Sequence, residues 1–225
     1  MKTVVITGAG RGIGFSLVQS FLSDPDYNVI ATSRNIDQLS KIENSRLTII
    51  KGDLNSDYTF IKEQILAACC SISTLLNNAA QILNKPILET SDSDILQVMD
   101  TNFNVPYKLI RDLESHFQKG THIINISSMS GFQGSKKFKG LSLYSASKAA
   151  LASLAECVAE EWKEKGVCCN CLALGAVDTD MIKISIPGME TRITSNQMAQ
   201  YIYDFSLKGH QFYNGRVLPV TLSTI

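Results

Sequence analysis

The most constraining feature of this chain is a short apolar segment followed directly by four closely spaced glycines. Residues 3–7 (TVVIT) are rich in β-branched side chains, which is typical of a strand buried on both faces of a parallel sheet. Glycines stand at positions 8, 10, 12 and 14, and apolar residues at helical spacing run from Phe15 to Leu22. Such a strand, turn and helix offer backbone N–H groups to a phosphate. The spacing is GxxxGxG rather than GxGxxG, and a purely structural turn is the alternative.

Strand-like and helix-like segments alternate along the rest of the chain. Strands are predicted over residues 28–32, 46–50, 73–76, 121–126, 167–172 and 216–220, and helices over 36–43, 57–68, 92–117 and 143–165. This alternation predicts an α/β fold with right-handed crossovers. We therefore expect one domain over residues 1–225, a doubly wound, Rossmann-like parallel sheet of about seven strands with helices on both faces. Pro219 has no N–H group to donate and places the final strand at an edge.

Charge and cysteine content narrow the classes of partner. Lys plus Arg and Asp plus Glu both number 21, so the net charge is zero and predicts neither a nucleic acid nor a membrane as partner. The first residues enter the strand pattern directly, without a recognisable leader, and we expect a cytoplasmic protein. The six cysteines have no His partners at metal-ligand spacing, so reduced thiols are expected and no metal site.

Polar residues follow several of the predicted strands and should lie together at the carboxyl edge of the sheet, where ligands bind in such folds. The strand over 28–32 ends in Ser33-Arg34, where an acidic residue would bind ribose hydroxyls and an arginine would accommodate a 2′-phosphate. The charge of Arg34 therefore favours NADP(H) over NAD(H), with a solvated surface arginine as the alternative. Asp53-Leu54 and residues 77–80 (NNAA) follow two further strands.

Tyr144 and Lys148 are the candidate acid–base pair. They lie four residues apart in a predicted helix, so their side chains share one face. A free phenol titrates near pH ~10 and a lysine near ~10.4, but a positive charge beside the phenol should lower its pKa and let it exchange a proton with a carbonyl oxygen. Ser128, at the end of a strand, could hold that oxygen. The alternative is a chance pairing of Tyr and Lys on one helix face.

Pro106 interrupts the helix predicted over 92–117. A proline cannot donate to the carbonyl four residues earlier, which here belongs to Asn102. We hypothesise that this free carbonyl holds a water that points toward Lys148, and a simple kink is the alternative. A high-resolution density map without a water between the two groups would exclude the idea.

Taken together, these motifs resemble the short-chain dehydrogenase/reductase family over essentially the whole chain. Thr7 to Gly14 is similar to the family's TGxxxGxG turn, and residues 77–80 are similar to its NNAG, with Ala80 in place of the glycine. Asn102, Ser128, Tyr144 and Lys148 match the family's catalytic tetrad in order and type. The resemblance implies an oxidoreductase that transfers a hydride between NADP(H) and a small carbonyl or alcohol substrate, most simply a carbonyl reductase.

The resemblance also implies a role for each site residue. Tyr144 would be the general acid in reduction, Ser128 would polarise the carbonyl, and Lys148 would bind the nicotinamide ribose and lower the tyrosine pKa. Asn102 would hold the relay water, while Asp53 would meet the adenine and Thr179 the carboxamide. The full set expected at the cofactor is Gly8, Arg11, Gly12, Ile13, Gly14, Ser33, Arg34, Asp53, Leu54, Asn78, Ala79, Tyr144, Lys148, Gly175, Val177 and Thr179.

Several features depart from the family pattern or leave the function open. Leu174-Gly175 stands where Pro-Gly is usual, and the loop over 135–142 carries Lys136, Lys137 and Lys139, which could favour an acidic substrate or form a solvated loop.

The helix over 143–165 is rich in small residues and, together with the helix over 92–117, could form the contact between subunits of a homodimer or homotetramer. A cofactor-binding sensor or scaffold with negligible turnover is the alternative function. The sequence specifies neither the substrate nor the reaction direction.

Overall fold

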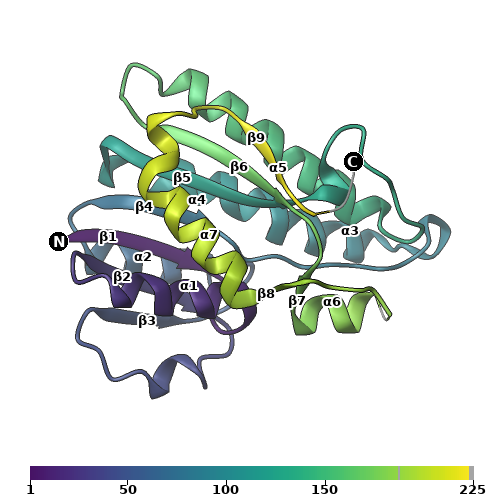
Figure 1. Ribbon diagram of the computed structural model, residues 1–225, viewed down its shortest axis with the longest axis horizontal. Helices are drawn as coiled ribbons and strands as arrows, with labels where there is room; N and C mark the ends of the chain where they lie inside the picture. The colour runs from purple at the N-terminus through teal and green to yellow at the C-terminus, as the bar shows by residue number, and fades with distance from the viewer. Residues whose placement is uncertain (187, 223–225) are drawn as a thin grey trace.

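The computed structural model describes residues 1–186 and 188–222, and its centre is a seven-stranded sheet in the order β3-β2-β1-β4-β5-β6-β9 (Figure 1). Every neighbouring pair in this sheet is parallel. The doubly wound parallel sheet that the alternation predicts is therefore confirmed. The seven strands are β1 (Lys2–Thr7), β2 (Tyr27–Ser33), β3 (Leu47–Lys51), β4 (Ile72–Asn77), β5 (Phe117–Ser128), β6 (Cys168–Leu174) and β9 (Val217–Val220).

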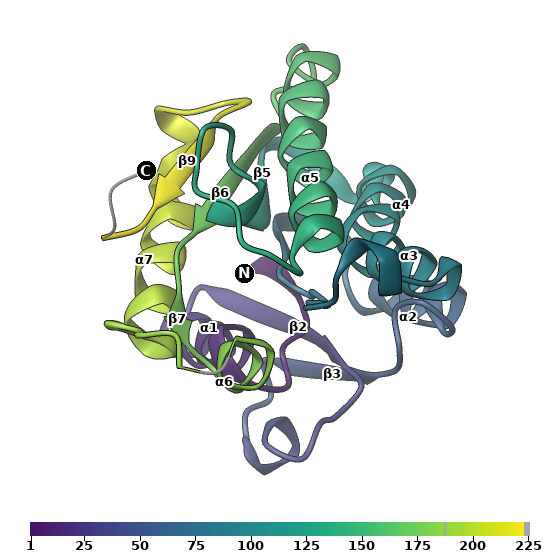
Figure 2. The ribbon, with the colours of Figure 1, turned by 90° about the vertical axis from the view of Figure 1, so that its right-hand side faces the viewer.

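Helices cover both faces of the sheet (Figure 2). One face packs against α1 (Gly12–Ser23) and α7 (Ser195–Lys208), and the other against α2 (Tyr58–Ala68), α4 (Val105–Asp112) and α5 (Ser142–Glu161). Alternate residues of β1 belong to the two hydrophobic cores on opposite faces of the sheet. Val4 and Ile6 pack on the face that α1 covers, whereas Val5 packs on the other face. Because both sides of β1 are buried, its sequence is a continuous apolar run rather than an alternating one.

The chain reverses direction across the sheet beside β1. It builds β2 and β3 outward on one side of β1, and then crosses to place β4 on the other side. Such a switch leaves a crevice beyond the carboxyl ends of the two central strands, where ligands bind in open α/β sheets. The ends of β1 and β4 are tied together here, because the Thr7 hydroxyl accepts hydrogen bonds from the backbone N–H groups of Asn78 and Ala79, both at 3.0 Å.

Two predicted helices differ from the observed structure. Residues 36–43 form only a 3-10 turn at Leu39–Lys41, because the Asn35 side chain accepts a hydrogen bond from the Asp37 N–H and starts a local turn instead. The helix predicted over 92–117 is broken into α3 (Asp92–Met99), a π-helical turn (Asp100–Asn104) and α4, and β5 already begins at Phe117. The π-helical turn ends two residues before Pro106, whose missing N–H prevents a regular helix from continuing through this point.

The sequence interpretation missed the elements that lie between β6 and β9. A two-stranded ribbon, β7 (Val177–Asp178) and β8 (Ile193–Thr194), flanks the short helix α6 (Asp180–Ser185), and α7 follows directly. The spacing of Met198, Ile202 and Phe205, all buried on α7, is the signal that predicts this helix. Within residues 1–186 and 188–222, β9 pairs only with β6, so the edge position expected from Pro219 is confirmed.

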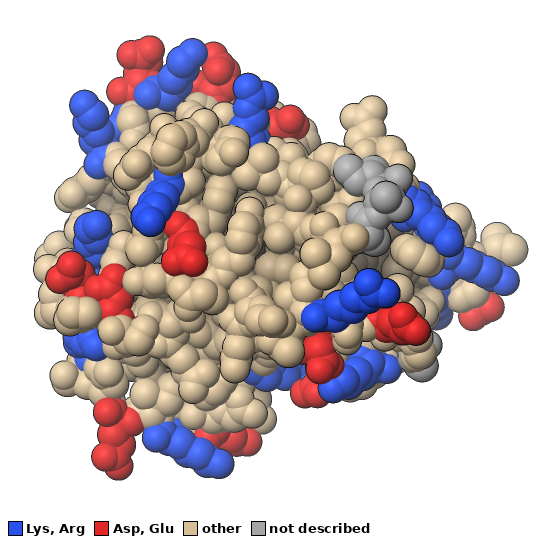
Figure 3. Space-filling model, in the orientation of Figure 1, with Lys and Arg blue, Asp and Glu red and all other residues tan. Residues whose placement is uncertain are grey.

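The surface shows no large area of a single charge on the face viewed in Figure 1, where basic and acidic side chains are interspersed (Figure 3). This distribution agrees with the formal net charge of zero. Within residues 1–186 and 188–222, no helix combines the length and the apolar character that a transmembrane span requires.

Candidate active site

The glycine turn between β1 and α1 shapes one end of a cleft at the carboxyl edge of the sheet. Gly8 and Gly12 have positive φ angles, +67° and +55°. A Cβ on Gly8 would lie 2.7 Å from the Ala79 Cα, so this glycine allows the turn to pack against the loop after β4. A Cβ on Gly12 would meet only Thr179, at 3.5 Å, so the backbone at Gly12 is open toward the cleft. Glycine is required here for conformation at Gly12 and for close packing at Gly8.

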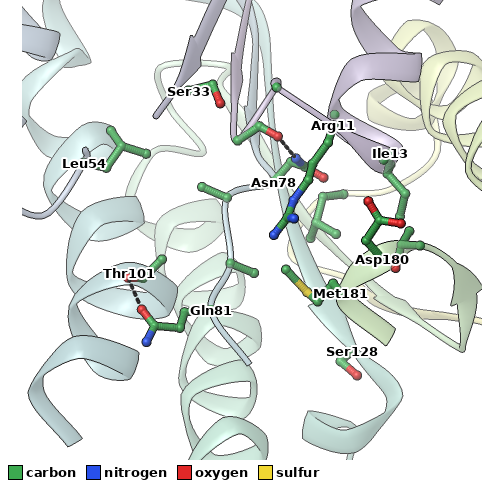
Figure 4. A pocket seen from close by; sticks show the side chains of 18 of the residues that line it. Arg11, Ile13, Ser33, Leu54, Asn78, Gln81, Thr101, Ser128, Asp180 and Met181 are labelled. Carbon is green, nitrogen blue, oxygen red and sulfur yellow. Dashed lines mark hydrogen bonds between the residues drawn. The ribbon is translucent and has the colours of Figure 1, made fainter. Parts of the chain in front are cut away.

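The N-terminus of α1 fits a phosphate group. Its N-cap residue, Arg11, makes no side-chain capping bond, and the first turn has no acidic residue. The first backbone N–H groups of the helix therefore keep the hydrogen-bonding capacity and the partial positive charge that favour an anion. The Arg11 side chain reaches into the cleft beside this turn (Figure 4).

The ends of β2 and β3 form the next part of the cleft. Ser33 and Arg34 face Asp53 and Leu54 across it, and the Arg34 guanidinium lies 3.6 Å from an Asp53 carboxylate oxygen. The Arg34 side chain is 70% exposed and that of Asp53 38%, so this ion pair is open to solvent and weak. Thr32 also lines the cleft, and its buried hydroxyl has no partner among the described residues. These groups offer one partly neutralised cation and an unsatisfied hydroxyl to a ligand.

Ser128, Tyr144 and Lys148 lie at the opposite end of the cleft. Ser128 is the last residue of β5, and its hydroxyl oxygen accepts hydrogen bonds from the N–H and the hydroxyl of Ser130 at 3.2 and 3.1 Å. With its oxygen engaged in this way, Ser128 can direct its own proton toward a substrate oxygen. The Lys148 ammonium donates to the Ile126 carbonyl at 2.8 Å and has no other protein acceptor in the part of the chain that the structure describes. Its remaining N–H groups can therefore serve a ligand.

Burial sets the protonation of the acid–base pair. It raises the pKa of Tyr144 to about 12, against a smaller opposite effect of a hydrogen bond with Ser128. Burial also lowers the pKa of Lys148 to about 8, partly offset by Cys171. The expectation that Lys148 depresses the tyrosine pKa is not met here, because desolvation of the phenol dominates and the ammonium lies 5.9 Å from the ring centre. The phenol is thus in its protonated, acidic form.

Asn102 lies beneath the cleft rather than in its wall. The π-helical turn Asp100–Asn104 carries it, and its side chain is fully buried. The amide accepts a hydrogen bond from the Gln81 N–H at 2.8 Å, and donates to the Gln81 carbonyl at 2.8 Å and to the Ser147 hydroxyl at 2.9 Å. The side chain thus links the loop after β4 to α5. The hypothesis that the Asn102 carbonyl holds a water toward Lys148 stays a prediction.

The structure shows the surroundings of the two departures noted in the sequence. Leu174 extends β6 to the cleft, and the next residue, Gly175, donates its N–H to the Val220 carbonyl at 2.9 Å. In the basic loop, the Lys137 ammonium donates to the Ser130 and Phe132 carbonyls, each at 2.7 Å, and to the Ser135 hydroxyl at 2.9 Å. Lys137 therefore organises its own loop and does not present a free charge to an acidic substrate.

One cleft brings together every residue expected at the cofactor. Two of these residues, Tyr144 and Lys148, are also catalytic candidates. Thr179 additionally serves as the N-cap of α6, because its hydroxyl accepts a hydrogen bond from the Ile182 N–H at 3.3 Å. The cofactor residues that line the cleft are Gly8, Arg11, Gly12, Ile13, Gly14, Ser33, Arg34, Asp53, Leu54, Asn78, Ala79, Tyr144, Lys148, Gly175, Val177 and Thr179.

The cleft also has lining residues that the sequence interpretation missed. Met181 and Ile182 reach it from α6, which has only six residues, too few for a helical apolar repeat to be recognised in the sequence. Gln81 and Thr101 contact each other across the cleft wall (Figure 4). The remaining missed lining residues are Gly10, Thr32, Gly52, Asn55, Ala80, Ile126, Ser127, Leu174 and Asp180.

Comparison with known proteins agrees with this geometry. The sequence profile of a family described as short chain dehydrogenase matches residues 2–188. The chain is 33% identical over 191 residues to the 2-dehydro-3-deoxy-D-gluconate 5-dehydrogenase of Pseudoalteromonas atlantica, which covers 80% of this chain and 73% of that protein. Among solved structures, ElxO with NADP bound is 27% identical with a TM-score of 0.83, covering 97% of this chain and 96% of ElxO.

A further structural neighbour holds a different cofactor. The 4-hydroxyisoleucine dehydrogenase complexed with NADH has a TM-score of 0.84 and covers 98% of this chain and 97% of its own, at 23% identity. At that identity the likeness shows the fold alone. Because the two neighbours carry NADP and NADH respectively, the shared fold is compatible with either nicotinamide cofactor.

Proposed function

Because this chain belongs to the short-chain dehydrogenase/reductase family, a family of oxidoreductases that act on alcohol and carbonyl groups, we propose that it is an NADP(H)-dependent carbonyl reductase. The observation that carries the proposal is the single cleft that joins the glycine turn at Gly8–Gly14 to Ser128, Tyr144 and Lys148. The backbone N–H groups at the N-terminus of α1 would hold the phosphates of a bound dinucleotide, and the cleft leads from there to the buried phenol.

The side chains at the far end of the cleft supply the acid–base part of the reaction. When bound, the nicotinamide supplies the hydride, because no side chain can do so. Ser128 donates a hydrogen bond to the substrate carbonyl oxygen, and the Tyr144 phenol transfers its proton to that oxygen as the carbon is reduced. The nearby Lys148 ammonium stabilises the resulting phenolate. Reduction thus adds one hydride and one proton across the carbonyl and gives an alcohol, and the reverse reaction returns both.

The preference for NADP(H) is supported by the charges at the ends of β1 and β2. The first two residues after β2, Arg34 and Asn35, include a cation and no carboxylate, and Arg11 lines the same cleft. Two cations are suited to the additional negative charge of a 2′-phosphate. Asp53 counteracts Arg34 in part, so the preference is expected to be a moderate difference in affinity rather than an exclusion of NADH.

The substrate is proposed as a small molecule with a carbonyl or alcohol group. The names of similar proteins cover a sugar-acid dehydrogenase and a reductase of acyl groups on a carrier protein, so they do not select one class. The test is NADPH oxidation with a panel of ketones, aldehydes, quinones and sugar acids. Turnover with any of them supports a reductase, whereas tight NADPH binding without turnover would favour the sensor or scaffold alternative.

The first mutational prediction concerns Tyr144. Tyr144→Phe removes the proton donor and keeps the ring, so turnover should fall by about 10²-fold or more while NADPH binding stays within about twofold of wild type. Activity is measured by NADPH absorbance and binding by isothermal titration calorimetry. Retained turnover in the variant would refute the role proposed for the phenol.

A self-association surface is also part of the proposal. The side of the molecule that carries α3, α4 and α5 (Figure 2) exposes large apolar side chains in or beside α3 and α4. Leu96 is 64% exposed and Tyr107 48%, and Leu88 in the preceding turn is 99% exposed. Exposed apolar side chains grouped in this way are typical of interfaces. We propose that a second copy of the chain covers them in a homodimer or homotetramer.

The cysteines support a reducing compartment. All six side chains are free thiols, and Cys169 and Cys171 are fully buried in β6. Free cysteines in this number are typical of reducing environments. We place the enzyme in the cytoplasm on this ground.

A further inference from the structure

Ser147 lies between the two catalytic residues of α5 but faces away from the cleft. Its side chain is fully buried, and its hydroxyl donates to the Tyr144 carbonyl at 2.8 Å. The same oxygen accepts a hydrogen bond from the Asn102 amide at 2.9 Å. The hydroxyl therefore joins the first turn of α5 to a side chain from a different part of the chain.

The Asn102 amide has no freedom to turn. Two of its bonds go to the backbone N–H and carbonyl of Gln81, and the third goes to Ser147. Gln81 belongs to the loop after β4, in which Asn78 and Ala79 are fixed to the end of β1 through Thr7. Hydrogen bonds and the short backbone segment from Ala79 to Gln81 thus connect the end of β1 to the backbone of Tyr144, and the last two of these bonds, at Ser147, are buried.

The first turn of α5 has no side-chain cap at its N-terminus. Its N-cap residue is Leu141, which cannot cap the helix with a side chain and makes no such bond. Tyr144 lies in this uncapped turn, where backbone N–H groups have no intrahelical partner. The bond from Ser147 to the Tyr144 carbonyl, held from outside by Asn102, therefore supplies an anchor that the sequence of the turn does not.

We propose that Ser147 is a positioning residue for the reaction: through Asn102 it fixes the first turn of α5, and with it the Tyr144 phenol, relative to the cofactor loop after β4. Ser147 touches neither substrate nor cofactor in this arrangement. The inference rests on the proposed function, because the position of the phenol matters to catalysis only if Tyr144 acts on a substrate.

The test compares Ser147→Ala with the wild type. This change removes both hydrogen bonds and only one oxygen atom, so kcat should fall about tenfold or more, since a displacement of about 1 Å can cost about 10²-fold. The Kd for NADPH, measured by calorimetry, should stay within about twofold. Ser147→Cys replaces the hydroxyl by a somewhat larger thiol that forms only weak hydrogen bonds, and should give an intermediate kcat.

A matched control and a double variant separate positioning from general stability. Ser153→Ala makes the same change at an exposed position of α5 and should keep the wild-type kcat. In an Asn102→Ala background, Ser147→Ala should lower kcat little further, because both residues act through one bond. A Ser147→Ala protein with a lower melting temperature but a wild-type kcat would overturn the inference, and Ser147→Cys provides the same comparison if the alanine variant does not fold.

A second readout does not depend on turnover. The ionisation of the Tyr144 phenol is measured by ultraviolet difference absorbance between proteins with and without Tyr144→Phe. Because burial raises the pKa of Tyr144, a loosened first turn should admit water and bring that pKa down toward its ordinary value in Ser147→Ala. An unchanged titration contradicts the inference about Ser147, whereas failure of the wild type to reduce any carbonyl contradicts only the proposed function.

Discussion

At the residue scale, the environment of Arg34 decides how strongly the protein separates the two nicotinamide cofactors. Its guanidinium is largely exposed and lies 3.6 Å from an Asp53 carboxylate oxygen. A bound 2′-phosphate would compete with that carboxylate for the same cation. The net gain from the phosphate is therefore the difference between two solvent-screened interactions, and it is smaller than the charge of Arg34 alone suggests.

The prediction at this scale is that Arg34→Ala weakens NADPH binding about tenfold, which corresponds to roughly 1.4 kcal/mol, and leaves NADH binding within about twofold. Both affinities are measured by calorimetry at one fixed salt concentration, because the interaction is screened. NADH serves as the internal control for damage to the fold. An equal loss for both cofactors would show that Arg34 does not read the 2′-phosphate.

At the scale of elements, β5, β6 and α7 are joined by a buried histidine. His122 lies in β5, its side chain is 1% exposed, and its ring nitrogens lie 3.3 Å from the Ser206 carbonyl of α7 and 3.0 Å from the Asn170 amide of β6. Burial lowers the pKa of His122 to about 4. The neighbouring His210 ring, 5.5 Å away, also has a pKa lowered by burial. Burial beside α7 therefore favours the uncharged form of both rings.

This packing predicts a stability that falls in mild acid. The unfolded chain takes up a proton on His122 near its ordinary pKa of about 6.5, whereas the folded chain does so only near 4. The stabilisation is thus complete above about pH 6.5 and is lost as the pH falls toward 4. Between pH 7 and 5 the free energy of unfolding should fall by about 2 kcal/mol from this residue, as measured by urea denaturation.

The control for this prediction is His122→Gln, which keeps a polar side chain but cannot take up a proton. Its stability at pH 7 should be lower, because the buried contacts of the ring are lost, and its slope between pH 7 and 5 should be flatter than that of the wild type. Since His210 contributes with the same sign, some slope should remain. Parallel curves for the two proteins would exclude His122 as the source of the acid sensitivity.

At the scale of the whole molecule, the exposed apolar side chains beside α3 and α4 determine how the chain associates. A single added charge in an apolar interface is unfavourable because it must be desolvated. Leu96→Glu should therefore shift the protein toward the monomer, as measured by size-exclusion chromatography with light scattering. Ile184→Glu adds the same charge at an exposed position of α6 and should not change the molar mass. A monomeric wild type would contradict the proposed interface.

Much of the fold follows from short-range patterns in the sequence. The run from Thr3 to Thr7 requires burial on two sides, and the positive φ angles at Gly8 and Gly12 require glycine. These patterns are local, so the parallel sheet and the glycine turn could be predicted. The broken helix at Asp100–Asn104 could not be placed, because proline indicates an interruption without saying whether a kink or a π-helical turn results.

The sequence by itself determined which residues could meet in the cleft, since parallel strands bring their carboxyl ends to one edge. Only the tertiary structure decided how those residues behave there. It made the Tyr144 phenol a weaker acid than a free phenol, bound Lys137 within its own loop, and turned the Asn102 side chain toward Ser147. The physical reason is that desolvation and hydrogen bonding depend on neighbours that are distant in the chain and become adjacent only when the chain is folded.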